Sequence, residues 1–285
     1  MELHVIETGY FKLDGGAMFG VVPKQMWSKI NPPDDNNMCT WALRCLLVKD
    51  GDRVILIDSG MGNKQDEKFR SHFEPHGEAT LISSIKKAGY APEEITDVLL
   101  THLHFDHVGG AVYRNKDQEL VPTFPNATYW SSEDHFNWAI DPNYREKASF
   151  LKENFVPLKE QGKLKYMPVE NGIHFSENIT LDFYNGHTEA LMAPTISLPD
   201  GKKIVFTSDL LPSSGHVRMP YVMSYDIRPL VTLKEKAKFY EKALDDNTYI
   251  FFEHDRLNVL GQLTRNDRGR YGIKLISEFD GLIGL

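Results

Sequence analysis

The stretch that decides the fold spans residues 101 to 110 and reads Thr101-His102-Leu103-His104-Phe105-Asp106-His107-Val108-Gly109-Gly110. It follows the apolar run 98–100, which is typical of a buried strand. Side chains alternate along a strand, so the first two histidines are expected to project the same way. The chain must then turn, which lets the aspartate and the third histidine approach from another direction. The glycine pair permits close backbone approach as a helix begins. A solvated histidine-rich turn is the alternative, but this spacing of imidazoles and a carboxylate favours two adjacent metal positions.

Composition limits the classes of protein that need to be considered. The chain has 285 residues, 41% of them hydrophobic and 25% charged, as in ordinary globular proteins of one or two domains. A net charge of −8 argues against nucleic acid as the main partner. No apolar run has the length of a membrane span, and the N-terminus lacks a signal-peptide pattern, so a cytoplasmic location is expected. Cys39 and Cys45 are expected to be reduced, although their spacing leaves a local disulfide open.

Strands and helices alternate along the rest of the chain. Asp58 directly follows a predicted hairpin and is either a turn former or a residue that orients a metal ligand. Aromatic residues are dense between 129 and 155, where His135 is interpreted as an ordinary surface or packed histidine. Short strands are predicted within 2–22 around a turn at 14–16, followed by an irregular segment 23–37. A hairpin is predicted from 42–48 and 54–57, and a further strand at 127–130. Helices are predicted at 80–88, from 133, at 144–155 and at 232–244, and a capping box opens the last of these.

Three further apolar runs end in residues that can bind a metal. The run 179–184 leads into His187, the run 204–208 into Asp209, and the run 249–252 into Glu253 and His254. Sheet-based enzymes gather their chemistry at strand ends. Four such runs, counting 98–100, therefore predict one convergent site, whereas any single run would be weak evidence.

The chain resembles the metallo-β-lactamase superfamily of metallohydrolases in motifs that occur in the same order: His102-x-His104-x-Asp106-His107, Gly186-His187-Thr188, Asp209 and His254. The resemblance implies an α/β fold, an αββα four-layer sandwich with two mixed β-sheets flanked by helices. We expect one domain over 1–285, with a helical, aromatic-rich insertion around 131–165. By the same resemblance, His102, His104 and His187 hold one metal. Asp106, His107 and His254 hold the second, and Asp209 bridges the two.

The resemblance also implies a reaction. Two divalent metal ions would hold a hydroxide that attacks a lactone or ester carbonyl, with Asp106 and Asp209 as the catalytic carboxylates. Zinc is the expected metal, and Mn, Fe or Co are alternatives that the same ligands accept. The expected partner is a small-molecule substrate, with no nucleic acid and no membrane, and a homodimer is left open.

Within the superfamily the chain is similar to the N-acyl homoserine lactonase branch, a quorum-quenching group, and to its methyl parathion hydrolase relatives. Many such lactonases place a tyrosine three residues after the bridging aspartate, where this chain has Pro212. Tyr221, Tyr225 or His216 are candidates to replace it. A phosphotriesterase or arylesterase of the methyl parathion hydrolase type is the first alternative, and a non-hydrolytic iron redox protein is the second. Loops at 18–37, 135–160 and 210–226 are expected to select the substrate.

Overall fold

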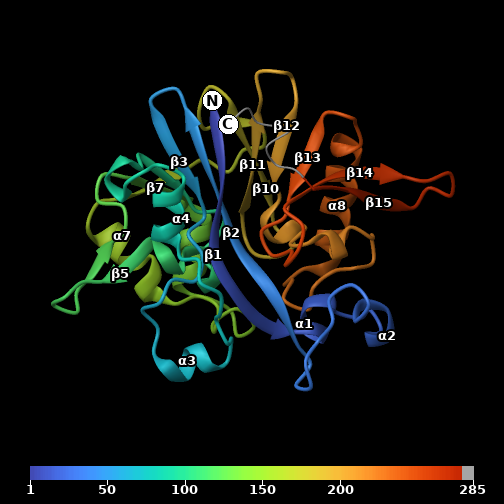
Figure 1. Cartoon of the computed structure of the whole chain (residues 1–285), viewed down its shortest axis with the longest axis horizontal. Coiled ribbons are helices and arrows are strands. Elements are labelled where there is room, and N and C mark those ends of the chain that lie inside the picture. The colour runs from blue at the N-terminus through green and yellow to red at the C-terminus, as the bar shows by residue number, and fades with distance from the viewer. Residues whose placement is uncertain (278–285) are drawn as a thin grey trace. The chain divides into compact units, whose positions relative to one another are not determined.

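The structure is a computed structural model that describes residues 1–277, and it divides into two compact units. Unit 1 comprises Met1–Tyr10 and Leu43–Val169. Unit 2 comprises Phe11–Ala42 and residues 170–277. Each unit contains a mixed β-sheet with helices against it (Figure 1). Mixed sheets flanked by helices agree with the predicted fold class, while the single domain over 1–285 stays a prediction.

The sheet of unit 1 has six strands in the order β1-β2-β3-β4-β7-β8. The pair β2–β3 is antiparallel, and the pairs β3–β4, β4–β7 and β7–β8 are parallel. The boundary between the units falls inside β1 and β2, so both strands continue into unit 2. The strands are β1 (Glu2–Asp14), β2 (Met38–Asp50), β3 (Arg53–Ile57), β4 (Asp97–Leu99), β7 (Thr128–Ser132) and β8 (Leu164–Met167), with a separate hairpin of β5 (Val112–Arg114) and β6 (Leu120–Pro122).

Helices cover this sheet with apolar side chains. Leu81 and Ile85 of α4, Phe136 of α6 and Leu158 of α7 share one buried cluster with strand residues such as Val98. Burial of this apolar surface is the main force that holds the helices on the sheet. The helices of unit 1 are α3 (Glu67–Ser71), α4 (Leu81–Lys87), α5 (Phe105–Val108), α6 (Glu133–Ile140) and α7 (Val156–Glu160).

Unit 2 has a seven-stranded sheet in the order β15-β14-β13-β12-β11-β10-β9. Only the β12–β13 pair is parallel among the described pairs of this sheet. Helix α8 lies against the sheet, where Phe239 and Tyr240 pack with Val205 and Ile250 (Figure 1). The elements are β9 (Ile173–His174), β10 (Ile179–Tyr184), β11 (Leu191–Ser197), β12 (Lys203–Phe206), β13 (Thr248–Phe251), β14 (Leu260–Arg265), β15 (Tyr271–Ile276), α1 (Gly15–Phe19), α2 (Lys24–Trp27) and α8 (Pro229–Ala243).

Most predicted elements are confirmed, because local patterns specify them. The hairpin of β2 and β3 turns at Gly51 and Asp52, directly after Asp50, and Thr80 caps α4 by accepting from the Ser83 N–H. Ser132 caps α6 in the same way, by accepting from the His135 N–H. The two cysteines are free and buried, so the disulfide left open in the sequence does not form.

Among the elements predicted before residue 160, three predictions are wrong. Residues 2–22 form one long strand and then helix α1, because the Asp14 carboxylate accepts from the Ala17 N–H and caps a helix where a turn was expected. The segment 23–37 contains α2, whose Trp27 is buried. Residues 144–155 do not form a continuous helix. The Ser149 carbonyl accepts from the distant Phe105 N–H instead of from the N–H group four residues further along the chain, as it would in a helix.

Candidate metal centre

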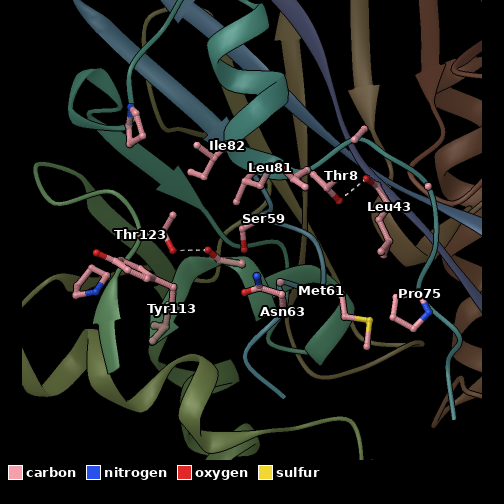
Figure 2. A pocket seen from close by; sticks show the side chains of 18 of the residues that line it. Thr8, Leu43, Ser59, Met61, Asn63, Pro75, Leu81, Ile82, Tyr113 and Thr123 are labelled. Carbon is pink, nitrogen blue, oxygen red and sulfur yellow. Dashed lines mark hydrogen bonds between the residues drawn. The ribbon is translucent and has the colours of Figure 1, made fainter. Parts of the chain in front are cut away.

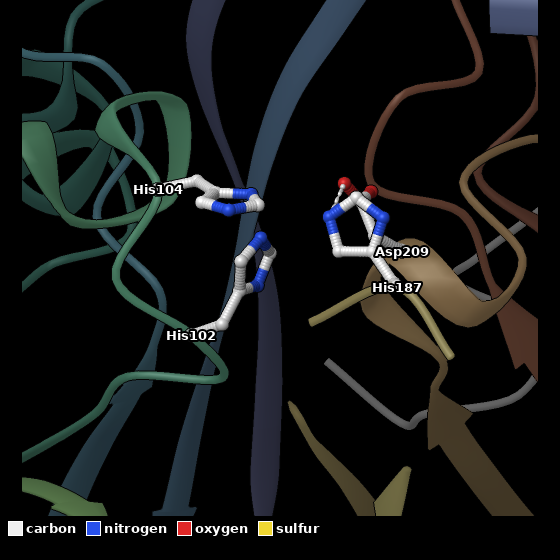
Figure 3. Close-up of side chains that lie close together, drawn as sticks. All are labelled: His102, His104, His187 and Asp209. Atoms are coloured by element: carbon white, nitrogen blue, oxygen red, sulfur yellow. Dashed lines mark ion pairs between the residues drawn. The ribbon is translucent and has the colours of Figure 1, made fainter. Parts of the chain in front are cut away.

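The four metal-capable residues of the motif in unit 1 lie together. His102 and His104 follow β4, and their rings meet edge to face with centroids 4.5 Å apart (Figure 3). Asp106 and His107 lie on the single turn of α5, which places the centroid of the His107 ring 3.9 Å from that of the His102 ring. All four side chains are buried. The four side chains therefore lie around one turn, as the sequence predicted, while their role as metal ligands stays a prediction.

The glycine pair lets the turn after the motif approach the segment that follows β3. A Cβ atom on Gly109 would lie 1.9 Å from the Met61 carbonyl oxygen, and one on Gly110 would lie 2.1 Å from the Ser59 carbonyl oxygen. No side chain fits at either distance. The Ser59 N–H in turn donates to the His107 carbonyl over 2.8 Å, which ties the motif to the end of β3.

Asp58 forms a turn and also contacts the surroundings of two predicted metal ligands, whose binding of a metal stays a prediction. It has a positive φ of 59° in the turn after β3, and its buried carboxylate orients two histidines. It accepts from the Thr101 N–H and hydroxyl at 2.8 and 2.6 Å, and it lies 3.1 Å from His107 Nδ1. Because the Thr101 hydroxyl donates to Asp58, its oxygen is an acceptor for His102 Nδ1, 3.2 Å away. Both imidazoles therefore carry their proton on Nδ1 and have Nε2 available for a metal.

In unit 2, helix α8 positions the turn that carries His187. The Glu235 carboxylate accepts from the N–H groups of Asn185 and Gly186 at 2.7 and 2.9 Å. A Cβ atom on Gly186 would lie 2.2 Å from the Thr232 hydroxyl oxygen, so this position requires glycine. The predicted capping box of Thr232 and Glu235 is therefore wrong. The helix begins earlier, at Pro229, and Glu235 binds the turn that precedes His187.

His187 lies between two carboxylates. Its Nδ1 is 2.9 Å from Asp226 Oδ1, and its Nε2 is 3.1 Å from Asp209 Oδ2 (Figure 3). Burial disfavours the charged imidazole, but Asp209 and then Asp226 outweigh it and raise the pKa of His187 to about 10. The surroundings of this imidazole therefore favour a positive charge, supplied by a proton or by a metal ion.

Asp209 also reaches a second imidazole, that of His254. Asp209 Oδ1 lies 3.3 Å from His254 Nε2. His254 Nδ1 is 2.8 Å from the Ala42 carbonyl oxygen, which can only accept, so Nδ1 carries the proton. In the neutral ring, the Nε2 lone pair then faces a carboxylate oxygen, an arrangement that is repulsive without a cation. The donor set of unit 2 therefore fits metal ions, with the two oxygens of one carboxylate directed at two different imidazoles.

The sequence did not identify the residue that orients His187. Asp226 is 39 residues from His187 in the chain, and no local pattern marks it. His216, a candidate replacement for the lactonase tyrosine, has both ring nitrogens engaged. Its Nε2 donates to the Met18 carbonyl, and its Nδ1 lies 2.7 Å from the Ser213 hydroxyl oxygen.

A separate cavity of about 580 Å³ lies within unit 1 (Figure 2). Its wall includes Leu81 and Ile82 of α4, Tyr113 of β5, and Ser59 and Met61 after β3. Among the described residues that line it, none is a predicted metal ligand. Of the described motif residues 101–110, Gly110 alone lines the cavity. Ser59 also lines it, and its hydroxyl donates to the His107 carbonyl.

Comparison with models of protein families shows which family the chain belongs to. The model of the metallo-beta-lactamase superfamily matches residues 44–254. The chain belongs to this superfamily. It is therefore a metal-dependent hydrolase, and members of the superfamily typically bind divalent metal ions.

Curated relatives include the N-acyl homoserine lactonase of Bacillus cereus, 22% identical over 80% of this chain and 86% of the relative. The N-acyl homoserine lactonase AttM of Rhizobium radiobacter is 23% identical over 61% of this chain and 63% of its own length.

Solved structures confirm the fold of this metallo-β-lactamase superfamily member. A probable metal-dependent hydrolase from Staphylococcus aureus has a TM-score of 0.85 and 27% identity, and the match covers 95% of this chain and 96% of that one. AidC, a dizinc quorum-quenching lactonase in complex with a product, has a TM-score of 0.78 and 23% identity, with 97% and 95% covered. Within residues 1–277 no helix is both long and apolar enough to cross a membrane.

Proposed function

We propose that the protein is a dinuclear hydrolase of lactones, with acyl homoserine lactones as the substrate class, an activity that would quench quorum signals. The observation that carries the dinuclear part is Asp209, whose two oxygens face His187 and His254 separately. A carboxylate placed in this way is suited to bridge two cations. The substrate class is supported by the curated lactonase relatives.

The seven predicted ligands divide between two metals in this proposal. One metal would be held by His102, His104 and His187, the second by Asp106, His107 and His254, and Asp209 would be shared. Two divalent cations would supply Lewis acidity for the substrate carbonyl and would lower the pKa of a water molecule. The buried Asp106 carboxylate would orient the attacking water or accept its proton. The outer partners of the imidazoles would keep the remaining ring nitrogens in the metal-binding tautomer.

Tyr221 is the residue we assign to hold the lactone oxygen in place of the tyrosine that Pro212 replaces. Its side chain is 4% exposed, and among residues 1–277 no hydrogen-bond partner of its hydroxyl is present. A buried hydroxyl without a partner is costly, so a ligand that accepts from it would be favoured. His216 is unsuited to this role because Met18 and Ser213 already engage its ring.

The test is a substrate panel run on protein with measured metal content. We expect two metal ions per chain, zinc among them, and ring opening of acyl homoserine lactones of several acyl lengths. His104→Ala and Asp209→Ala should abolish turnover while circular dichroism stays that of a folded protein. Turnover near wild type in either variant, or no turnover of any lactone, would contradict the assignment.

The same panel separates the two alternatives. Preferential hydrolysis of a p-nitrophenyl phosphotriester or aryl ester would favour the methyl parathion hydrolase type. The aromatic insertion gives that alternative little support, because Phe136, Phe150 and Phe155 are buried in the core of unit 1. Bound iron with oxygen consumption and no hydrolysis would favour a redox protein.

A further inference from the structure

The insertion that follows β7 contacts three consecutive residues of the metal motif. The Leu103 N–H donates to His135 Nε2 over 2.8 Å, and the Phe105 N–H donates to the Ser149 carbonyl over 2.9 Å. Between them, the His104 ring packs on Phe150 with centroids 4.7 Å apart. The insertion therefore supports the backbone and the ring of the motif in the segment between β4 and α5.

Glu146 adds a charge to this contact. Its Oε1 lies 3.4 Å from His104 Nε2, and its side chain is almost completely buried. Glu146 Oε2 accepts from Trp138 Nε1 at 2.8 Å and from Asn143 Nδ2 at 2.5 Å. Both donors are neutral, so they satisfy one oxygen of the carboxylate without neutralising it. A buried carboxylate is stable only when its other acceptor site is also used.

We propose that Glu146 is the positioning residue of His104. Its Oε1 lies close to His104 Nε2 without meeting hydrogen-bond geometry in this structure, and its charge favours the proton on Nε2, so that Nδ1 is the nitrogen available to a metal. His104 is then reversed relative to the four other histidines, because His102, His107, His187 and His254 engage their outer partners through Nδ1. Its metal-binding role rests on the proposed function, whereas the tautomer itself depends only on contacts inside unit 1.

Glu146→Gln is a sharp test because it should move the proton of His104 to the other ring nitrogen with little change in the shape of the side chain at 146. The donors from Trp138 and Asn143 require an acceptor at the Oε2 position, so the amide oxygen is held there. The amide NH2 group then faces His104 Nε2 and donates to it. The proton of the imidazole moves to Nδ1, the nitrogen that the metal needs.

The primary readout is nuclear magnetic resonance of metal-free protein labelled with 15N-histidine, with His104 assigned from a His104→Gln spectrum. We expect Nε2–H in the wild type and a shift toward Nδ1–H in Glu146→Gln. The second readout is zinc affinity from chelator competition, which should fall by roughly 10- to 100-fold at one site. Glu153→Gln is the matched control, because this carboxylate lies in the same insertion but pairs with Arg114 at 2.7 Å, and it should change neither readout.

Each outcome decides the proposal. Nδ1–H on His104 in the wild type would overturn it without any variant, which covers the case in which Glu146→Gln does not fold. An unchanged tautomer in folded Glu146→Gln would overturn it as well. A tautomer switch in a protein that binds no metal would support the role of Glu146 in holding the ring and contradict the proposed function instead.

Discussion

At the scale of single residues, the proposed centre depends on imidazole tautomers that are set from outside it. Asp58, Asp226 and the Ala42 carbonyl each engage a ring nitrogen, so one nitrogen of each histidine is kept for a metal. Two of these outer partners are charged, and charge-assisted hydrogen bonds are shorter and stronger than neutral ones. Outer carboxylates of this kind raise the basicity of the imidazole they hold, which strengthens its bond to a metal.

Tyr221→Phe tests how the substrate is held. Removal of the hydroxyl should weaken lactone turnover by roughly three- to tenfold, the value of one lost hydrogen bond. Stability should stay near wild type, because among the described residues no partner of the hydroxyl is left unsatisfied. Michaelis–Menten kinetics on an acyl homoserine lactone measure the effect, and Tyr144→Phe, at a fully exposed tyrosine, is the control. Unchanged kinetics in Tyr221→Phe would contradict the proposal that Tyr221 holds the lactone oxygen.

The buried imidazole of His216 is expected to lower the free energy of unfolding in acid. Burial is the largest cause and lowers the pKa of His216 from 6.5 to about 4. The unfolded chain therefore takes up a proton near pH 6.5 that the folded chain refuses until about pH 4, and stability falls as the pH drops through this window. In metal-free His216→Gln, the slope of unfolding free energy against pH should be shallower by up to about 1.4 kcal/mol per pH unit. Urea unfolding between pH 4.5 and 7 measures it, and a slope equal to that of wild type would contradict it.

At the scale of elements, the sequence predicted the strands and the residues at their ends, but not what surrounds them. The runs before His102, His187, Asp209 and His254 are local patterns of apolar residues, and they appear as β4, β10, β12 and β13. Glu235 instead looked like part of a capping box, although it binds a turn 49 residues away. Such pairings arise from tertiary packing, which overrides short-range propensity and leaves no periodicity to read.

Helix α8 also fixes the loop between Asp209 and Asp226 through a buried lysine. Lys236 is 1% exposed, and its ammonium donates to the carbonyls of residues 216, 218, 219 and 221, at 2.7 to 3.4 Å. Lys236→Met should lower the free energy of unfolding by roughly 1–3 kcal/mol, because buried carbonyls lose their donor. Urea unfolding measures the loss. Lys238→Met, at an exposed position of the same helix, should cost little, and equal stability in the two variants would refute the role of Lys236.

At the scale of the whole molecule, the proposed ligands are dispersed along the chain. The motif from His102 to His107 belongs to unit 1, whereas His187, Asp209 and His254 belong to unit 2. A peptide that carries the motif alone would therefore supply only part of the ligand set. The metal dependence that follows from this is a property of the folded chain, since an unfolded chain cannot bring these segments together without a large entropic cost.

Metal removal should therefore destabilise the whole chain. A ligand that binds only the folded state adds about 2.7 kcal/mol of stability at a free concentration of a hundred times its Kd. We expect chelated protein to melt at a lower temperature than zinc-loaded protein, and zinc to restore the difference. His104→Ala in unit 1 and His254→Ala in unit 2 should each reduce the rise in Tm that zinc produces, because each removes one proposed ligand. His174→Ala, at an exposed histidine, is the control. If His254→Ala kept the full rise while His104→Ala lost it, zinc would be bound by the motif without His254, and the proposed ligand set of the second metal would be wrong.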